Sequence, residues 1–255
     1  MIGQVREMAR RSILQTLRQP AMVIPPVVFP LLLVAINAAG LDAATKIPGF
    51  PADSYWDFAI AVPFIQGSLF AAINAGTAMA RDVETGFLKR LAMTPMQRMA
   101  LLIGQLIGVM LVAFASALIY LTVGFAAGMN FKSGVLGVPA IIALAVLIAL
   151  AFAAIGAYIG LRSGSGEAVQ GIFPLLFVFL FLSSVNLPRN LIEQDWFRTV
   201  ATYNPVSYLV EGVRSLIITG WDGQALALGF GLAAAIAAGA VTLASRALRT
   251  RLIRT

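Results

Sequence analysis

The sequence contains no cysteine and no histidine. These absences exclude disulfide frameworks, thiolate nucleophiles, zinc sites built from cysteine and histidine, and acid–base chemistry on imidazole. Charged residues are also scarce, at 11% of 255 residues, whereas ordinary soluble domains carry roughly 25%. Hydrophobic residues make up 60% of the chain, and the mean hydropathy is +0.89. A soluble chain could not cover so much apolar surface, so lipid must be the solvent for much of this protein.

Six apolar stretches are long enough, or nearly so, to cross a bilayer, which takes about 20 residues. They are residues 21–41, 58–80, 99–127, 138–161, 168–185 and 225–244. The fifth is the weakest, because it is short and contains Pro174. The sequence therefore predicts an all-α integral membrane protein with six transmembrane helices in a single domain, residues 1–255.

A patterned basic segment, residues 1–20, precedes the first predicted span. Arginines and apolar residues alternate in it at helical spacing, and Pro20 ends the pattern. The apolar positions are Val5, Met8, Ala9, Ile13 and Leu17. We expect an N-terminal amphipathic helix that lies in the membrane interface. The alternative is a retained signal anchor with a basic flank.

Basic residues are distributed unevenly between the two sides of the predicted membrane. With both chain ends inside, thirteen of the 18 Lys and Arg residues fall in inner segments. Positive charge gathers on the cytoplasmic side of membrane proteins. We therefore expect a multi-pass protein of a bacterial plasma (inner) membrane with cytoplasmic N- and C-termini. This topology also accounts for the net charge of +7, so nothing in the sequence requires a nucleic-acid partner.

Two segments between the predicted spans are more than simple turns. Residues 186–222 are too apolar for a solvated loop, and Asn204-Pro205 divides them into two helical pieces. Because the pieces are too short to cross a membrane, we interpret them as an extracellular re-entrant helical hairpin. The alternative is two helices that lie flat on the outer surface. The second segment, residues 81–98, lies on the inner side.

Glycines recur at four-residue spacing in the third and fourth predicted spans. The pairs are Gly104 and Gly108, Gly124 and Gly128, and Gly156 and Gly160. This spacing allows helix backbones to approach closely. We interpret the pairs as packing sites within the chain rather than as a dimer seam.

Polar residues inside the predicted spans are neutral, apart from acids at the edges such as Asp57. Intramembrane enzymes and proton-coupled carriers normally need ionisable side chains within the bilayer, so the sequence argues against both. It also contains no phosphate-binding loop of the form Gly-x-x-x-x-Gly-Lys-Ser/Thr. We expect no enzyme activity, cofactor or metal site in this chain. If ATP drives the protein, another chain binds it.

The inner segment 81–98 carries the most informative pattern. After a glycine, apolar residues alternate with basic ones up to a Thr-Pro step: Gly86, Phe87, Leu88, Lys89, Arg90, Leu91 and Thr94-Pro95. The pattern predicts a short helix that docks on a soluble partner and presents Glu84 and Arg90 for charge-assisted hydrogen bonds. The alternative is an interfacial helix that only connects two spans.

This segment resembles the intracellular loop of type 2 ATP-binding-cassette (ABC) exporter permeases, especially the daunorubicin-resistance type. In that family the loop runs Glu, one residue, Thr/Ser-Gly, then a Leu-Lys/Glu-Arg-Leu run and a Thr-Pro step. Six positions match: Glu84, Gly86, Arg90, Leu91, Thr94 and Pro95. The likeness extends over nearly the whole chain and includes the run from Asn204 to Arg214. The short first outer loop, residues 42–57, disfavours the branches that carry large extracellular domains.

The resemblance implies a permease subunit of an ATP-driven exporter. A separate nucleotide-binding ATPase subunit, which binds ATP and Mg²⁺, would grip residues 81–98 as a coupling helix and make a smaller contact at residues 162–167. The implied interface residues are Glu84, Gly86, Leu88, Arg90, Leu91, Pro95, Arg162 and Glu167. A second permease copy, giving a homodimer or a heterodimer, would complete the pathway among the membrane lipids.

A hydrophobic or amphipathic substrate, such as a drug, an antibiotic or a lipid-like molecule, suits a pathway without charges. The candidate substrate-facing residues in the second and fifth spans are Phe64, Gln66, Asn74, Phe173, Phe177 and Phe181. The alternative for the aromatic residues is contact with lipid or core packing. Two other functions stay open: an ATP-independent secondary carrier or channel, and a scaffold that recruits a soluble partner without transport.

Overall fold

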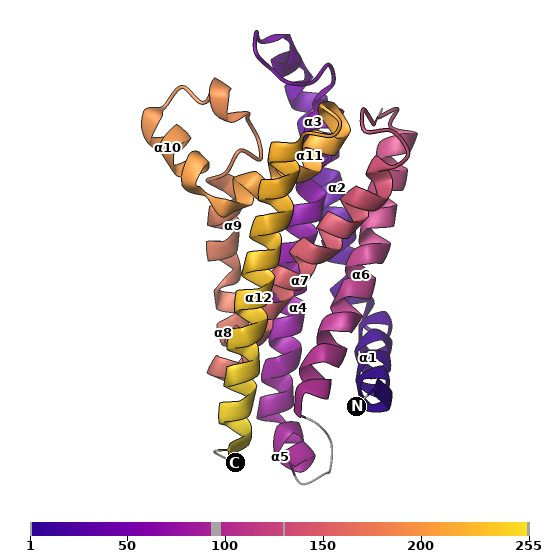
Figure 1. The fold of residues 1–255 in the computed structure, drawn as a ribbon, viewed down its shortest axis with the longest axis vertical. Helices are drawn as coiled ribbons and strands as arrows, with labels where there is room; N and C mark the ends of the chain where they lie inside the picture. Colours follow the sequence, from indigo (N-terminus) through magenta and orange to yellow (C-terminus); the bar gives the residue numbers. More distant parts are fainter. Residues whose placement is uncertain (1, 93–97, 130, 254–255) are drawn as a thin grey trace.

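The computed structural model describes residues 2–92, 98–129 and 131–253. Regular structure in these residues is entirely helical, which confirms the predicted all-α class. The long helices lie side by side in one elongated bundle, with both chain ends at the same end of it (Figure 1). We call this the terminal end, and the opposite one the far end.

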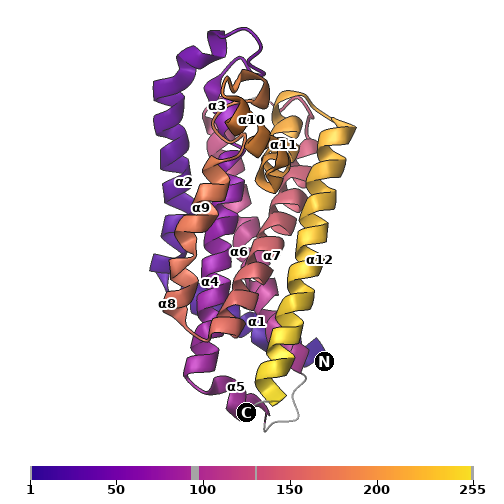
Figure 2. The same ribbon diagram turned by 90° about the vertical axis from the view of Figure 1, so that its left-hand side faces the viewer.

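Five stretches are long and apolar enough to cross a membrane: 23–46, 55–84, 99–126, 137–163 and 223–251. Their main helices are α2 (Pro20–Leu41), α4 (Val62–Glu84), α6 (Arg98–Ala126), α7 (Gly137–Ser163) and α12 (Gly223–Ile253). Figure 2 shows α2 and α12 at opposite edges of the bundle with α4 and α7 between them. These five stretches overlap five of the six predicted spans.

The remaining predicted span, residues 168–185, has a different form. It consists of two short helices, α8 (Gly166–Gly171) and α9 (Phe173–Phe181), which together make one shorter apolar unit. Pro174 lies in the first turn of α9, where a backbone N–H group has no partner within the helix and its absence costs nothing. Because Pro174 cannot donate a hydrogen bond to the preceding turn, it also prevents α8 from continuing into α9. The six-span count therefore stays a prediction.

The shorter elements lie at the two ends of the bundle (Figure 1). At the terminal end are α1 (Ile2–Leu17) and α5 (Phe87–Ala92). At the far end are η1 (Asp42–Lys46), α3 (Tyr55–Ala59), η2 (Arg189–Leu191), α10 (Asp195–Tyr203) and α11 (Pro205–Ile218). The break predicted at Asn204-Pro205 separates α10 from α11, because Pro205 occupies the first turn of α11 while the Asn204 side chain accepts a hydrogen bond from the Val206 N–H.

Glycines bring α4 and α7 into backbone contact at the centre of the bundle. A Cβ atom built on Gly156 would overlap the carbonyl oxygen of Ala72, and one on Gly160 would overlap that of Gly76. Gly76 in turn leaves no room for a Cβ atom, which would lie 2.7 Å from the Gly156 carbonyl oxygen. Without a hydrophobic force between helices in lipid, such close van der Waals contact is a main source of packing energy.

A second glycine pair receives α1 on the surface of α6. A Cβ atom on Gly104 would overlap Met8, and one on Gly108 would overlap Ser12. Two of the three glycine pairs thus pack against helices of the same chain, as the sequence interpretation expected, whereas a Cβ atom on Gly128 of the third pair meets nothing within 4 Å. The apolar face of α1 that this contact buries centres on Ala9, which is 8% exposed.

Prolines interrupt the hydrogen bonding of α2, and α6 supplies a substitute partner. Pro30 has no N–H to donate to the carbonyl of Pro26 four residues earlier. The Tyr120 hydroxyl donates to that carbonyl at 2.5 Å. Because an unsatisfied backbone group costs several kcal/mol in lipid, this bond fixes α2 against α6.

Substitution of Gly156 tests the α4–α7 contact. Gly156→Ala forces the helices apart, and we expect a loss of roughly 1–3 kcal/mol or more in unfolding free energy, the usual cost of overpacking. The matched control is Gly239→Ala in α12, where a Cβ atom meets nothing within 4 Å. Thermal unfolding of the detergent-purified variants measures both. Equal midpoints for the two variants would show that the contact is not tight.

Candidate functional site

The predicted coupling segment begins where α4 ends. Gly86 adopts a φ of +67°, a left-handed conformation that lets the chain turn from α4 into α5. Arg90 is exposed on α5, whereas Leu88 is 3% exposed and packs inside the bundle. Leu91 also lies in α5. Thr94 and Pro95 fall outside the described residues.

Glu84 links the two inner segments to each other. Its Oε1 atom accepts a hydrogen bond from the Gly166 N–H at 3.0 Å, at the first turn of α8. A carboxylate is favourable there, because the first N–H groups of a helix have no partner within it. The predicted interface residues of the second segment, Arg162 and Glu167, flank this bond and are exposed. No local pattern indicates this link, because 82 residues separate its partners.

A buried ion pair connects α1 to the coupling segment. Arg11 Nη2 lies 2.7 Å from Asp82 Oδ1, and the Asp82 side chain is only 8% exposed. The same guanidinium lies over the ring of Phe87, 4.2 Å from its centroid. Arg11 therefore touches the last turn of α4 and the first residue of α5 together. Sequence reasoning treated this arginine only as part of a basic face.

Phenylalanines form a row along the face of α9 that packs on α4 and α2. The centroids of Phe173 and Phe177 are 4.6 Å apart, and those of Phe177 and Phe181 are 6.1 Å apart. Phe70 of α4 contacts the first two, with centroids 5.3 Å and 6.4 Å away. Phe29 of α2 reaches Phe177 at 6.5 Å. Spacing along α9 indicated the row, but nothing in the sequence indicated Phe70 or Phe29 as its neighbours.

Gln66 and Phe181 line one hollow between α2, α4 and the end of α9. Its volume is about 280 Å³, which is near the lower end of small-molecule sites at ~300–1,000 Å³. Gln66 is 2% exposed, and its Oε1 atom has no hydrogen-bond partner among the described residues. A buried acceptor without a partner is costly, and Gln66 is one of the residues that line the hollow.

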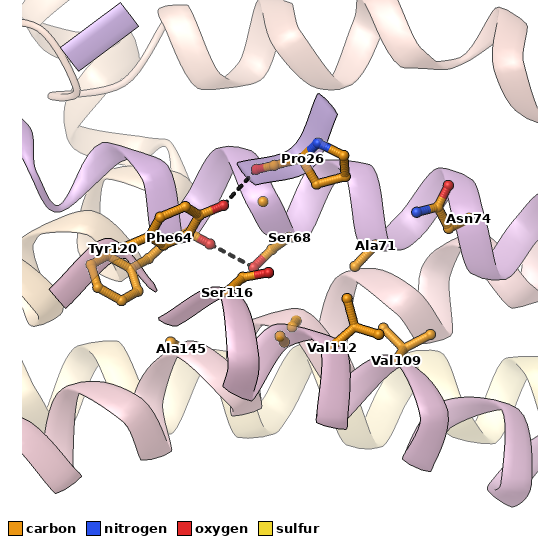
Figure 3. A pocket seen from close by; sticks show the side chains of 13 residues that line it. Pro26, Phe64, Ser68, Ala71, Asn74, Val109, Val112, Ser116, Tyr120 and Ala145 are labelled. Atoms are coloured by element: carbon orange, nitrogen blue, oxygen red, sulfur yellow. Dashed lines mark hydrogen bonds between the residues drawn. The ribbon is translucent and has the colours of Figure 1, made fainter. Parts of the chain in front are cut away.

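Phe64 and Asn74 lie on another side of α4 and line a separate cavity between α2, α4, α6 and α7 (Figure 3). Tyr120 and Phe64 close one end of this cavity, and Asn74 and Val109 stand at the other (Figure 3). Its volume is about 50 Å³, several times the ~10–15 Å³ that one water molecule needs. The structure therefore does not bring all six predicted pathway residues together.

A buried arginine ties α11 to the rest of the far end. Arg214 is 6% exposed and donates to the backbone carbonyls of Phe58, Ser184 and Val185, each at 3.0 Å. Its guanidinium also lies 3.5 Å from the centroid of the Phe58 ring. These bonds satisfy carbonyl groups where α3 ends and where the chain leaves α9. Arg214 belongs to the family-like run from Asn204 to Arg214, but the sequence alone does not indicate which groups it binds.

A second ionic contact joins α11 to the segment before α10. Arg189 and Glu211 form a two-pronged pair, with Nε of Arg189 2.9 Å from Oε1 of Glu211. Partial burial acts to lower the pKa of Arg189, but the hydrogen bonds and charge of Glu211 outweigh it and raise the pKa. Ser184 also donates to Glu211, at 2.7 Å. The α10–α11 unit is thus held on α3 and α9 by polar bonds.

Substitution of Arg214 tests this attachment. Arg214→Leu leaves three carbonyls without donors, so we expect a loss of roughly 2–4 kcal/mol after the removed cost of a buried charge is offset. The control is Arg198→Leu, which removes an exposed pair with Asp195 and should change stability by about 0.5 kcal/mol at most. Thermal unfolding in detergent measures both. If Arg214→Leu is no less stable than the control, the three bonds do not hold α11.

These features define a polytopic helical membrane protein in which the ion pairs of the described residues lie at the two ends of the bundle. The sequence profile of the ABC-2 type transporter family matches residues 3–218, most of the chain. The chain therefore belongs to the ABC-2 type transporter family and is a membrane subunit of an ABC transporter.

Similar proteins include a probable doxorubicin resistance ABC transporter permease protein DrrC of Mycobacterium tuberculosis. It is 26% identical over 156 residues, which cover 61% of this chain and 55% of the relative. The putative transport permease ycf38 of Porphyra purpurea is 25% identical over 226 residues, 87% of this chain and 77% of that protein. The ycf38 protein of Pyropia yezoensis is 26% identical over 219 residues, covering 85% and 74%. The chain thus spans little more than half the length of the DrrC relative.

Proposed function

We propose that this chain is the permease subunit of an ATP-driven exporter that works with a separate ATPase subunit. The family membership carries the proposal. Support comes from the lack of a phosphate-binding loop in the sequence and from the exposed Arg90 on α5, beyond the end of α4. The terminal end of the bundle then faces the cytoplasm of a bacterial inner membrane, in agreement with the distribution of basic residues.

In this proposal, movement of the ATPase reaches the membrane through one contact between subunits and one contact within the chain. Arg90 on α5 binds the ATPase, while Glu84 passes the displacement to α8 through its bond with Gly166. Because α9 follows α8 directly, a shift of α8 moves the phenylalanine row past Phe70 of α4. Glu84 is thus a positioning residue rather than an ATPase contact.

The substrate path follows the face that α2, α4 and α9 share, where two permease copies pair. The hollow that Gln66 and Phe181 line has mostly apolar walls together with the amides of Asn37, Gln66 and Asn186 and no charged side chain among the described residues. A hydrophobic or amphipathic molecule with a hydrogen-bond donor fits this lining better than a charged one. The name of the DrrC relative, a doxorubicin resistance permease, is consistent with export of such a compound.

Separate substitutions of Arg90 and Glu84 test the proposal. Pull-down of the tagged chain in mild detergent should recover an ATPase. We expect Arg90→Ala to reduce its recovery, because an exposed charged contact is lost. Glu84→Gln should retain the ATPase but lower substrate-stimulated ATP hydrolysis several-fold, because a neutral amide is a weaker acceptor for the Gly166 N–H.

The matched control is Arg246→Ala, which removes an exposed positive charge from α12 at the same end of the bundle. This variant should change neither readout. Loss of the ATPase in Glu84→Gln would place that carboxylate at the interface instead. A protein that never recovers an ATPase, yet takes up substrate into liposomes along an ion gradient, would overturn the exporter proposal in favour of a secondary carrier.

A further inference from the structure

Two neighbouring cavities share part of their lining on α4 and α6: one is closed by α2 and α7, and the other by α1. The cavity nearer the far end, which we call the upper cavity, is the one in Figure 3 and ends at Asn74 and Val109. The lower one, about 40 Å³, shares both of these residues and continues to Gln19 and Arg81 at the terminal end. We call the two together the α1–α4–α6 crevice. Its walls come from α1, α2, α4, α6 and α7 of this chain.

The mouth of the crevice opens on a basic face of α1. Gln15 and Gln19 line both the lower cavity and a hollow along this face, whose charged residues are Glu7, Arg10, Arg11 and Arg18. Glu7 lies within ion-pair distance of Arg10, at 3.8 Å, and Arg11 pairs with Asp82. Within the described part of the chain, Arg18 and Arg81 have no ion-pair partner. The mouth therefore favours a negatively charged group.

The lining changes from polar to apolar with depth. Beyond Arg81 come the amides of Gln105 and Asn74 and the hydroxyl of Thr77, and the upper cavity is walled mainly by Val109, Val112 and other apolar groups. No acidic side chain lines either cavity among the described residues. An ion surrounded by water would gain nothing from the deep part, whereas an amphiphile matches both parts.

Thr77 adds an independent sign of an occupant. A threonine inside a helix usually donates its hydroxyl to a carbonyl of the preceding turn. The Thr77 Oγ1 atom is shielded from solvent and has no partner among the described residues, although Thr77 lines the lower cavity. A buried hydroxyl without a partner costs about 1–3 kcal/mol, which an ester or phosphate oxygen in the crevice removes.

The depth of the crevice matches one leaflet. Thr77 and Ser68 are nine residues apart on α4, which is about 13 Å at 1.5 Å per residue. One leaflet is about half of a hydrocarbon core that is ~30 Å thick. The length of the crevice therefore suits one acyl chain that runs from a headgroup at Arg81 towards Ser68.

We propose that the α1–α4–α6 crevice binds one anionic phospholipid from the leaflet at the terminal end. Arg18 and Arg81 bind its phosphate, Thr77 donates to an ester oxygen, and one chain enters the cavity of Figure 3. The second chain stays among the bulk lipids. The site is separate from the phenylalanine face, and it does not rest on the proposed transport function.

Native mass spectrometry of the full chain, purified with any co-purifying partner, tests the site. The probes are phosphatidylglycerol, phosphatidylcholine and soluble glycerol phosphate. We expect one tightly held phosphatidylglycerol per chain, weaker phosphatidylcholine, and no competition by glycerol phosphate. Saturable binding of glycerol phosphate alone would identify a soluble-anion site and overturn the lipid proposal, as would equal affinity for the two lipids.

Substitutions then locate the lipid. The double variant Arg18→Gln, Arg81→Gln should weaken phosphatidylglycerol binding about 30-fold, from the usual contribution of two basic residues near a membrane surface. Its matched control is Arg246→Gln, Arg249→Gln, which removes the same charge from α12. Equal weakening in both double variants would mean non-specific attraction by net charge and would overturn the site.

A second pair of variants tests the deep part without altering charge. Val109 lines both cavities, so Val109→Phe should block the acyl chain and reduce phosphatidylglycerol retention at least tenfold. Leu111→Phe, on the exposed face of the same helix, should leave retention unchanged. Retention by the Val109→Phe variant at the level of the control would contradict entry of a chain into the cavity.

Discussion

Helices α4 and α7 meet with backbone against backbone, and the positions of the other helices follow from that contact. Gly156 and Gly160 sit on the carbonyl groups of Ala72 and Gly76, so the two helices are fixed in both separation and register. In lipid this contact must replace the hydrophobic force that assembles soluble proteins. It also fixes the rotation of α4, which decides which side chains face α6 and which face α9.

As a consequence, each face of α4 contacts different neighbours. One face is occupied by α7 through Ala72 and Gly76. A second carries Phe64 and Asn74 into the cavity beside α6, and a third carries Gln66 and Phe70 towards α2 and α9. A residue on one face cannot join a site on another without rotating the helix, and the α7 contact prevents such rotation.

Unsatisfied backbone groups form the second constraint. The Pro26 carbonyl loses its helical donor to Pro30 and takes the Tyr120 hydroxyl instead. At the far end, Arg214 serves three carbonyls where helices stop short. Both are solutions to one requirement, that backbone at membrane depth must find a partner within the protein. They also make α2 and α11 depend on side chains of distant segments.

The sequence could predict what depends on neighbours along the chain. Hydropathy located five of the long helices, glycine spacing indicated close packing, and Asn204-Pro205 marked the boundary between α10 and α11. Hydropathy also led to a single span at residues 168–185, where a turn at Ile172 separates α8 from α9. Neither hydropathy nor local sequence pattern could predict contacts between distant segments. Nothing about Glu84 alone shows that its acceptor oxygen lies beside the N–H of Gly166.

The bond between Glu84 and Gly166 changes how the terminal end of the protein is understood. The sequence treated segments 81–98 and 162–167 as two surfaces that a partner would contact separately. Since Glu84 joins them, and Arg251 of α12 donates to the carbonyls of Leu161 and Arg162 beside them, they form one connected unit. A partner that pushes on α5 therefore acts on α8 as well. Because only a short turn separates α8 from α9, the phenylalanine row is the nearest membrane element on which that push can act.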